Sequence, residues 1–485
     1  MTLTLDHLAH LLRAEQLLIA APEQDGVVEA LATDSRAVTP GALFIALPGT
    51  QVDGHRFVAA AGAAGARAAL VEHPVDTALP QVVVRDAHRA AIVLARHWHG
   101  HPTAGMRLVG ITGTNGKTTT TALVRHLLDE GGNAGTIGTL GAFDGAGEKV
   151  PSTAGSLTTP GPVDLQATFA ALAARGVRQV AMETSSHSLD QGRLDGLEFQ
   201  AGIFTNLTRE HLDYHETMAR YLAAKLRLVD LLATDGFAIV NADDPAWAPI
   251  TRRPLVTFGR SGNAMVRAEG EVAGAGGTRF ALTGVFGTRE IDLPIAGEFN
   301  VANALGAAAC ALALGRPLAE VADRLDTAPQ VPGRMERLAA APCTVLRDYC
   351  HTPDAFERVL AALRPLTAGQ LVILFGCGGD RDRGKRPEMG EIAGRLADQV
   401  YLTTDNPRSE DPDRIIDDIA AGMGGRPYHR ILDREEAIAA AIASASAGDT
   451  ILLAGEGHET YQLIGGRKLP FDERAIVRTL TRQEP

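Results

Sequence analysis

The sequence GITGTNGKTTTT, residues 110–121, decides how the rest of this chain is interpreted. It stands between an apolar stretch that predicts a strand and the segment TALVRHLLDE, in which apolar residues recur at helical intervals. Glycines in such a loop let backbone N–H groups approach phosphate oxygens, and the helix N-terminus favours negative charge. The order of strand, glycine loop, Lys-Thr and helix therefore predicts an ATP or GTP site rather than a glycine turn with an incidental lysine.

The loop departs from the strict Walker pattern, because the position five residues before Gly116 is Ile111. It is a variant, G-x-x-G-K-T, that begins at Gly113. In this variant Lys117 would reach the terminal phosphates and Thr118 would be a ligand of Mg²⁺. Phosphate binding alone does not identify the reaction, since motors, switches, kinases and ligases all bind phosphates.

The composition is that of an ordinary globular protein. Of the 485 residues, 45% are hydrophobic and 21% are charged, so extensive disorder is not expected. The formal net charge is -12 and no run of five Lys or Arg occurs, which disfavours a surface for nucleic acid or anionic membranes. The four cysteines show no CxxC spacing, and no signal peptide or membrane span is visible. We therefore expect a cytoplasmic protein that neither binds nucleic acid nor inserts into a membrane.

Alternating strands and helices divide the chain into three α/β units. Residues 1–103 alternate short apolar strands with alanine-rich helices, and residues 104–333 contain the phosphate loop in a parallel-sheet pattern. Near residues 255–295 the pattern changes to short strands separated by glycines, which predicts an antiparallel flap. In residues 334–485 three apolar strands run directly into polar or glycine-rich loops, where ligands of parallel sheets bind. We predict an α/β fold of three domains, with a central P-loop parallel-sheet ATPase domain and a C-terminal Rossmann-like domain.

Three polar residues of the central unit are further candidates. Glu183 ends an apolar strand, where a carboxylate can be a ligand of Mg²⁺, although a helix cap or solvated group is the commoner role. His211 follows another strand, and Lys225 lies on the next predicted helix. A lone histidine is usually structural and a lone helical lysine is usually solvated. These residues alone therefore do not identify the chemistry.

Five motifs, taken in order along the chain, resemble those of the ATP-dependent Mur ligases of bacterial cell-wall synthesis. They are GTNGKTTT, ETSSH, TNLTREHLDYH with a downstream AAK, DYCHTPDA and GCGGDRDRGKRP. The resemblance covers nearly the whole chain and is strongest to the third ligase of the family. It implies that ATP phosphorylates the D-glutamate carboxyl group of UDP-N-acetylmuramoyl-L-alanyl-D-glutamate, and that an amine then displaces phosphate to form an amide. The three predicted domains would bind the UDP-linked substrate, ATP and the amino acid, in that order.

The resemblance implies catalytic roles for Lys117, Glu183, His211 and Lys225. Magnesium would be held by Thr118, Glu183, His211 and Lys225. Lys225 would be N-carboxylated with CO₂, because a carbamate attracts Mg²⁺ whereas an ammonium repels it. The residues implied in ATP binding are Gly113, Thr114, Asn115, Gly116, Lys117, Thr118, Thr119, Asn303, Arg334 and Asp348. A helix cap at Asn303 and a linker salt bridge at Arg334 are the alternatives.

The resemblance also implies two groups of substrate contacts. Those with the UDP-linked substrate are Ser35, Thr50, Gln51, Val52, Thr158, Thr159, Ser185, Gln191 and Arg193. Those with the incoming amino acid are Arg381, Asp405, Asn406, Pro407, Arg408, Gly455 and Glu459. In the family the motif DNPR accompanies meso-diaminopimelate, and Arg408 would bind its distal carboxylate. Glu456 departs from a lysine common in the family and reverses a charge beside this pocket, and DNPR could instead be a simple turn.

Several other functions stay open. The same ligase could add L-lysine, and a folylpolyglutamate synthetase-like ligase would share the nucleotide loop but is not expected to contain DNPR or TDSR. A nucleic-acid-dependent ATPase would need basic strips, and a non-catalytic nucleotide-binding module would not need Glu183, His211 and Lys225 together. We expect a monomer whose ligands are ATP, Mg²⁺, the UDP-muramoyl dipeptide and meso-diaminopimelate.

Overall fold

The computed structural model describes residues 3–49, 52–151, 157–274 and 276–481. The chain forms two compact units: residues 1–265 with 306–316, called unit 1, and residues 266–305 with 317–485, called unit 2. The α/β class predicted from the sequence is confirmed, because parallel strands alternate with helices in both units. The predicted boundaries after residues 103 and 333 stay predictions. None of the described helices is both long and apolar enough to span a bilayer.

Unit 1 begins with a five-stranded sheet of order β2-β7-β6-β5-β4, in which only β2 is antiparallel to its neighbour. Alternate residues of β5 face opposite sides: Leu43 and Ile45 enter one apolar core, and Phe44 enters the other. The elements are β1 (Leu3–Thr4), α1 (Leu5–Ala14), β2 (Leu18–Ala20), β3 (Val27–Val28), β4 (Ala30–Ala32), β5 (Ala42–Ile45), α2 (Val58–Ala63), β6 (Ala68–Val71), β7 (Gln81–Val84) and α3 (Ala87–Trp98).

The second sheet of unit 1 contains the phosphate loop. Its strands β9, β12, β8, β13, β14 and β15 are parallel and lie in that order, and the hairpin strands β10 and β11 extend it beyond β9. The strands are β8 (Arg107–Thr112), β9 (Ala134–Gly138), β10 (Gly141–Phe143), β11 (Lys149–Val150), β12 (Gln179–Glu183), β13 (Phe199–Phe204), β14 (Leu232–Asn241) and β15 (Leu255–Gly259). The helices are α4 (Lys117–Leu128), α5 (Pro162–Ala174), α6 (Ser186–Asp190), α7 (Leu212–His215) and α8 (Met218–Asp230).

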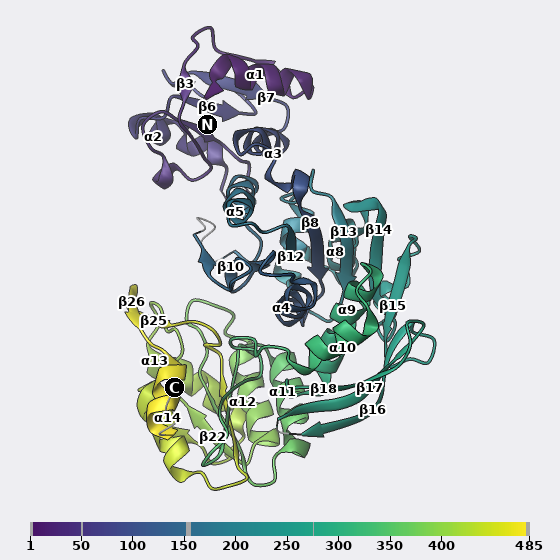
Figure 1. Cartoon of the computed structure of the whole chain (residues 1–485). Coiled ribbons are helices and arrows are strands. Elements are labelled where there is room, and N and C mark those ends of the chain that lie inside the picture. Colours follow the sequence, from purple (N-terminus) through teal and green to yellow (C-terminus); the bar gives the residue numbers. More distant parts are fainter. Residues whose placement is uncertain (1–2, 50–51, 152–156, 275, 482–485) are drawn as a thin grey trace. The chain divides into compact units, whose positions relative to one another are not determined.

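The strand order explains where a site can form. Strand β8 lies between β12 and β13, so the carboxyl ends of all three strands meet at one edge of the sheet (Figure 1). From β8 the chain crosses to β9 on one side, and from β13 it crosses to β14 on the other. The order therefore reverses beside β8, which is where open parallel sheets bind ligands. The phosphate loop after β8, Glu183 at the end of β12 and the segment after β13 all emerge at this edge.

Unit 2 contains the predicted antiparallel flap and a six-stranded sheet. The flap strands β16 (Val266–Gly274), β17 (Gly277–Gly284) and β18 (Arg289–Leu293) are antiparallel, as the sequence predicted. The prediction was wrong for residues 255–259, because β15 pairs parallel with β14 in the sheet of unit 1. The six strands have the order β19-β20-β24-β21-β22-β23, and only β19 is antiparallel. They are β19 (Glu336–Ala339), β20 (Thr344–Asp348), β21 (Leu371–Phe375), β22 (Gln399–Leu402), β23 (His429–Arg430) and β24 (Thr450–Ala454). The remaining elements that begin in unit 2 are α9 (Glu298–Ala313), α10 (Leu318–Asp326), α11 (Pro353–Leu363), α12 (Lys385–Leu396), α13 (Pro412–Ala420), α14 (Arg434–Ser444), the hairpin of β25 (Tyr461–Ile464) and β26 (Arg467–Pro470), and α15 (Glu473–Thr481).

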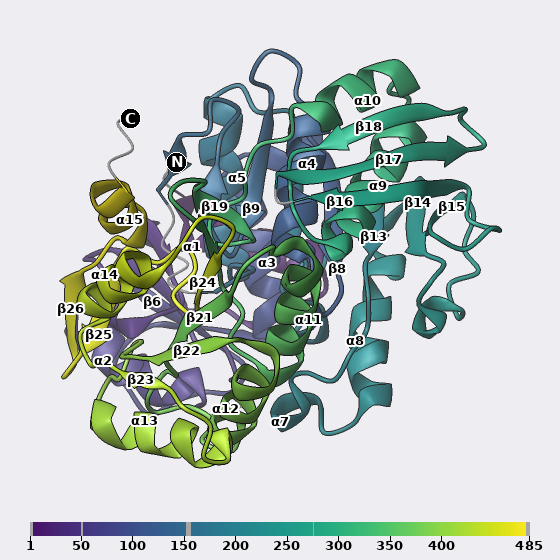
Figure 2. The same cartoon turned by 90° about the horizontal axis from the view of Figure 1, so that it is seen from below.

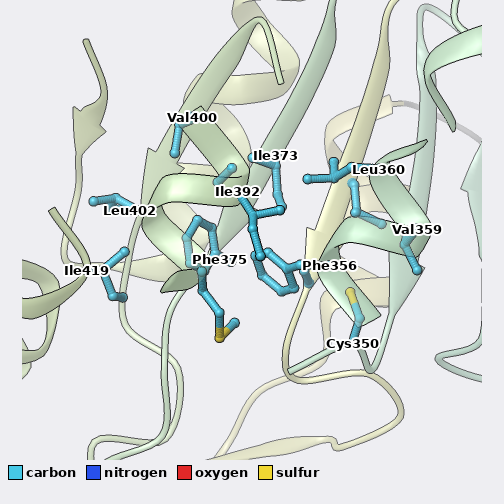
Figure 3. Close-up of a cluster of buried hydrophobic side chains, with 14 of the residues drawn as sticks. Cys350, Phe356, Val359, Leu360, Ile373, Phe375, Ile392, Val400, Leu402 and Ile419 are labelled. Carbon is cyan, nitrogen blue, oxygen red and sulfur yellow. The ribbon is translucent and has the colours of Figure 1, made fainter. Parts of the chain in front are cut away.

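Helices cover both faces of this six-stranded sheet. Ile373 and Phe375 of β21 pack with α11, α12 and α13, whereas Val372 and Leu374 pack with α14 and α15. Figure 2 shows α14 and α12 on opposite sides of β21 and β22. In the first layer the rings of Phe356 and Phe375 meet edge to face, with centroids 4.8 Å apart (Figure 3). The three-layer arrangement confirms the predicted Rossmann-like domain, and it leaves the strand ends of β21, β22 and β24 free to present loops.

Candidate active site

The phosphate loop is closed by hydrogen bonds to the segment after β13. Thr114 N–H donates to the carbonyl of Asn206 at 2.7 Å, and Asn115 N–H donates to the side-chain oxygen of Asn206 at 2.9 Å. Gly113 has a φ of +149°, and a Cβ there would overlap Thr205 Oγ1. Backbone conformation and packing therefore both require glycine at position 113.

Two lysines point at carbonyl oxygens of this loop. Lys117 Nζ donates to the carbonyls of Gly113 at 3.1 Å and Thr114 at 2.8 Å. Lys225 Nζ, from α8, donates to the same Gly113 carbonyl at 2.7 Å, and the residue is only 1% exposed. Burial, and then the nearby Lys117 ammonium, hold the pKa of Lys225 well below its ordinary value, against the opposite effect of Glu210. The shift raises the share of neutral amine above that of an exposed lysine, and the neutral amine is the form that can react with CO₂.

Glu183 lies buried at the end of β12 and is 1% exposed. Its carboxylate accepts hydrogen bonds from Thr139 N–H at 2.9 Å and Thr139 Oγ1 at 3.1 Å. Among the described residues it forms no ion pair. A buried carboxylate without a cationic partner is costly, so a bound divalent cation would supply the missing charge.

His211 follows β13 and lies in the left-handed region, with a φ of +55°. Its ring contacts that of His187 edge to face, with centroids 4.8 Å apart. Burial lowers the pKa of His211, although neighbouring Glu210 opposes this shift. Burial and the adjacent His211 and His215 lower the pKa of His187 to about 4. Both rings are thus neutral at pH 7, and a neutral imidazole is the form that binds metals.

In the described part of the chain, Glu183 and His211 form no ready-made group for a divalent cation. Among the described residues, only Asp53, His55 and His73 form a group of three His, Cys, Asp or Glu side chains whose ligand atoms lie within 4.8 Å of one another. In that group both ring nitrogens of His55 already form hydrogen bonds, to Asp53 at 2.6 Å and with Glu72 N–H at 2.8 Å, so we assign it a structural role. Glu183 and His211 belong to no such group. A further anionic ligand, such as a carbamate on Lys225, would be needed beside them.

Predicted substrate residues lie beside Glu183. Thr159 Oγ1 donates to the Glu183 carbonyl at 2.8 Å and lies 3.3 Å from Ser185 Oγ, while Thr158 Oγ1 lies 3.2 Å from Thr139 Oγ1. The nearby Arg193 donates to the Thr159 carbonyl at 3.1 Å.

Arg193 also donates through Nε to Gln191 Oε1 at 2.9 Å, and Gln191 Nε2 in turn donates to Tyr214 OH at 3.2 Å. Within the described part of the chain Arg193 pairs with no carboxylate, and burial lowers its pKa. A half-buried guanidinium held by neutral acceptors is suited to an anionic substrate group.

Two other predicted contacts lie in the N-terminal part of unit 1. Ser35 begins a short 3₁₀ turn after Asp34, whose carboxylate pairs with Arg36, and Val52 is 47% exposed. Thr50 and Gln51 lie outside the described residues. Among the described residues, neither Ser35 nor Val52 forms a hydrogen bond with another predicted substrate contact.

The predicted base and ribose contacts of the nucleotide lie in unit 2. Asp348 ends β20 and accepts hydrogen bonds from the N–H groups of Met335 at 2.7 Å and Cys350 at 2.8 Å, and burial raises its pKa. The Arg334 guanidinium lies over the Tyr349 ring, 5.1 Å from its centroid. Asn303 is buried on α9 and donates to Asn300 Oδ1 at 3.0 Å, so it does not cap that helix.

The predicted amino-acid contacts come together at the strand ends of the six-stranded sheet. Asn406 Nδ2 donates to Glu459 Oε2 at 3.0 Å and to Glu456 Oε2 at 3.1 Å. Gly455 has a φ of +108°, and a Cβ there would overlap the Asp405 carboxylate. The loops after β22 and β24 thus enclose a set of acids around Asn406.

Arg408 is a basic group among the predicted amino-acid contacts. Its Nη1 donates to the carbonyl of Gly379 at 2.8 Å, and among the described residues it forms no ion pair. Gly378 leaves room for this guanidinium, because a Cβ at that position would lie only 2.8 Å from Nη1 of Arg408. The same Cβ would lie 3.7 Å from Cγ of Arg381, which is exposed. Pro407 is buried, and its carbonyl lies where a Cβ at Gly379 would be. The guanidinium is held by carbonyls and has no carboxylate of its own.

Three residues that contribute to these arrangements were missed from the sequence. Thr139 holds both oxygens of Glu183, and His187 packs on His211. Tyr221 is fully buried, and its hydroxyl lies 3.2 Å from Thr114 Oγ1. Tyr221 precedes Lys225 by four residues on α8, which is the one sequence signal that could have placed it on the same helix face.

Comparison with known proteins agrees with this architecture. Residues 27–97 match the Mur ligase family catalytic domain, residues 111–311 match the Mur ligase middle domain, and residues 333–457 match the Mur ligase glutamate ligase domain. The UDP-N-acetylmuramoyl-L-alanyl-D-glutamate--2,6-diaminopimelate ligase of Bacillus licheniformis is 42% identical over 469 residues, which cover 94% of this chain and 95% of that protein. The corresponding ligase of Thermosynechococcus vestitus is 43% identical over 475 residues, or 95% of each chain. A solved structure of a ligase with this name superimposes with a TM-score of 0.67 and 32% identity, and covers 99% of both chains. The chain belongs to the Mur ligase family of ATP-dependent ligases.

Proposed function

We propose that this protein uses ATP to join meso-diaminopimelate to the D-glutamate carboxyl group of UDP-N-acetylmuramoyl-L-alanyl-D-glutamate, a step of peptidoglycan precursor synthesis. The observation that carries the proposal is the 42% identity, over 94% of the chain, to a ligase with this name. The aligned region spans all three predicted domains, so it includes the segments proposed to bind each substrate as well as the nucleotide loop. Such substrates place the enzyme in the cytoplasm, and we propose that it acts there as a monomer.

The phosphate loop and its lysines would prepare the first chemical step. The D-glutamate carboxylate must attack the γ-phosphorus of ATP, so two anionic groups have to approach each other. Lys117 would leave the loop carbonyls and reach the terminal phosphates, and Thr114, Asn115, Gly116 and Thr119 would surround them through the loop and the start of α4. The products of this step are ADP and an acyl phosphate.

Magnesium and the modified lysine would neutralise the remaining charge. A bound Mg²⁺ would supply positive charge that offsets these anionic groups. Thr118, Glu183 and His211 would hold it, and Lys225 would join them as a carbamate. The lowered pKa of Lys225 supports this modification, because the neutral amine attacks CO₂ and gives up a proton as the carbamate forms. The modification would replace a buried amine with a further anionic ligand in addition to Glu183.

Arg193 would hold the UDP-linked substrate through an anionic group, with Gln191, Ser185, Thr158 and Thr159 lining the same position. Ser35, Thr50, Gln51 and Val52 would contact the uridine and diphosphate. Asn303, Arg334 and Asp348 would contact the base, phosphates and ribose of ATP. These assignments rest on the family motifs and on the half-buried Arg193 that pairs with no described carboxylate.

The amino-acid pocket supports meso-diaminopimelate over L-lysine. The distal end of meso-diaminopimelate carries a carboxylate and an ammonium group, whereas that of lysine carries only the ammonium. Arg408, whose guanidinium donates to the Gly379 carbonyl, would bind the distal carboxylate. Glu459, with Asp405 and Asn406, would bind the ammonium group. Lysine would leave Arg408 without an anion, which disfavours its selection.

One assay tests the proposal. Purified protein is incubated with ATP, Mg²⁺ and the UDP-muramoyl dipeptide, together with meso-diaminopimelate, L-lysine or L-glutamate in turn. We expect ADP and phosphate, and a peptide precursor lengthened by meso-diaminopimelate when it is detected by mass spectrometry. Hydrolysed ATP without a lengthened precursor would refute the ligase assignment, AMP and pyrophosphate would refute the acyl phosphate, and preferred addition of L-lysine would refute the assigned amino acid.

A further inference from the structure

A buried tyrosine lies beside several of the predicted catalytic residues at the carboxyl ends of β8, β12 and β13. Tyr221 lies on α8, which packs against β8 and β14 (Figure 1), and its side chain is fully buried. Its hydroxyl lies 3.2 Å from Thr114 Oγ1, in the phosphate loop. Lys225 Nζ is 4.4 Å from the centre of its ring, and the ring of His211 lies edge to face with a centroid 6.2 Å away. One side chain thus contacts the loop and lies beside two of the four predicted metal-binding residues, Lys225 and His211.

The direction of the Tyr221 hydrogen bond follows from the bonds around Thr114. Thr114 Oγ1 donates its single hydrogen to the Thr208 carbonyl at 3.1 Å and accepts from Thr208 N–H at 2.9 Å. With the Thr114 hydrogen directed to Thr208, Tyr221 is the donor toward Thr114. Burial raises the pKa of Tyr221, so the phenol keeps this proton throughout the working pH range. The hydroxyl therefore adds a third fixed contact to the Thr114 side chain.

The ring of Tyr221 restrains Lys225 from the side. Lys225 Nζ lies over this ring while it donates to the Gly113 carbonyl at 2.7 Å. Spacing of four residues on α8 places the two side chains on one face of the helix. The amine thus lies between the Tyr221 ring on one side and the phosphate loop on the other. This leaves it a fixed position from which to react with CO₂.

We propose that Tyr221 is a positioning residue that couples the phosphate loop to Lys225 and His211. Its hydroxyl fixes the loop for nucleotide binding, and its ring fixes the amine for carboxylation and His211 for metal binding. The inference rests on the proposed function only for the meaning of the carbamate and the metal. A residue that merely fills the core would need the ring's volume but neither the hydroxyl nor its direction.

Three variants separate these roles. Tyr221→Phe removes the hydrogen bond and keeps the ring, Tyr221→Leu removes both, and Thr114→Val removes the same hydrogen bond from the loop side. Tyr401→Phe is the matched control, because it deletes a tyrosine hydroxyl that is hydrogen-bonded to Ser444 in unit 2. Nucleotide affinity is measured with a non-hydrolysable ATP analogue, and lysine carboxylation is measured by NMR after incubation with ¹³C-bicarbonate.

We expect Tyr221→Phe to weaken binding of the analogue by about 2- to 10-fold, the range of one hydrogen bond, and to retain the ¹³C carbamate signal. Tyr221→Leu should lose most of that signal and lower kcat by about 100-fold. In the Thr114→Val background Tyr221→Phe should have little further effect, because the bond is already absent. Tyr401→Phe should match wild type in both measurements.

Unchanged affinity in Tyr221→Phe, or an additive loss in the double variant, would overturn the inference. A full carbamate signal in Tyr221→Leu would overturn the role of the ring. If Tyr221→Leu does not fold, the Phe and Val variants decide the role of the hydroxyl and Tyr221→Met replaces Leu for the ring. Failure of the wild type to form any amide would refute the proposed function alone, because the analogue affinity and the NMR signal do not depend on product formation.

Discussion

Replacing Gly113 by alanine tests whether the loop conformation itself controls nucleotide binding. The residue has a φ of +149°, which L-residues other than glycine rarely adopt. The new Cβ would overlap Thr205 Oγ1 and lie 3.1 Å from Asn206 N and O. Thr205 cannot move freely, because its Oγ1 donates to the Asn115 carbonyl at 2.8 Å. The alanine therefore strains the backbone and also displaces the hydroxyl that holds the loop.

The size of the effect follows from these two terms. Backbone strain of this kind costs about 1–3 kcal/mol. Displacing Thr205 loses one hydrogen bond, or about 0.5–1.5 kcal/mol. If the loop must return to the observed conformation to bind phosphate, the affinity for ATP falls by about 10-fold at the lower bound and about 1000-fold or more at the upper. Calorimetric titration with a non-hydrolysable ATP analogue measures this directly.

Two further variants show where the loss originates. Gly131→Ala is the matched control, since Gly131 has a φ of +65° but no atom within 4 Å of its Cβ position. It should lose stability without losing nucleotide affinity. Thr205→Ala removes the overlapping oxygen, so its combination with Gly113→Ala should recover part of the affinity. Wild-type affinity in Gly113→Ala, or an equal loss in Gly131→Ala, would refute the reasoning.

Three other predictions concern buried charge and recognition. Because the native pKa of Lys225 is lowered, the unfolded chain binds more protons between that pKa and 10.5, and wild-type stability rises with pH in this window. Lys225→Met should therefore have a larger free energy of unfolding than wild type, and the difference should shrink as pH approaches 10.5. Urea unfolding at several pH values measures this difference, and a constant difference would contradict the lowered pKa of Lys225. Arg408→Asn should raise KM for meso-diaminopimelate by at least about 10-fold with little change in ATP affinity. The control Arg358→Asn, at an exposed position, should change neither quantity. Wild-type kinetics in Arg408→Asn would show that Arg408 does not bind the amino acid. Asn406→Asp should destabilise unit 2 by about 2 kcal/mol at pH 7 and by less in acid. The reason is that the amide that donates to Glu456 and Glu459 is replaced by a third carboxyl group. An unchanged midpoint of urea unfolding would contradict that geometry.

The strand-to-loop transitions could be predicted from the sequence because they depend on local periodicity. The loop after β8, Glu183 at the end of β12 and the acidic loops after β22 and β24 each follow an uninterrupted apolar strand. Parallel pairing then brings such loops together without further information. The same logic predicted the flap, whose short strands are separated by glycines.

The supporting residues could not be predicted because their partners are distant in sequence. Thr139 holds Glu183 across 44 residues, and Tyr221 holds Thr114 across 107. On a helix with an apolar face, Tyr221 is indistinguishable from a core residue, since its polar function depends on a loop from another strand. The pairing order of β12, β8 and β13 is what makes these contacts possible, and no local pattern encodes that order.

Glu456 shows why a change of residue type does not translate directly into a change of charge. The sequence predicted a reversed charge beside the amino-acid pocket. The residue is 1% exposed, and burial together with the neighbouring Asp405 holds the pKa of its carboxyl group well above the ordinary value. Its Oε2 accepts from Asn406 Nδ2 at 3.1 Å, which fixes the amide that also holds Glu459. A carboxyl group whose pKa is raised adds a hydrogen-bonding partner to Asn406 and carries less negative charge than an exposed carboxylate would, so it weakens the positive field of Arg408 less than the change of residue type suggests.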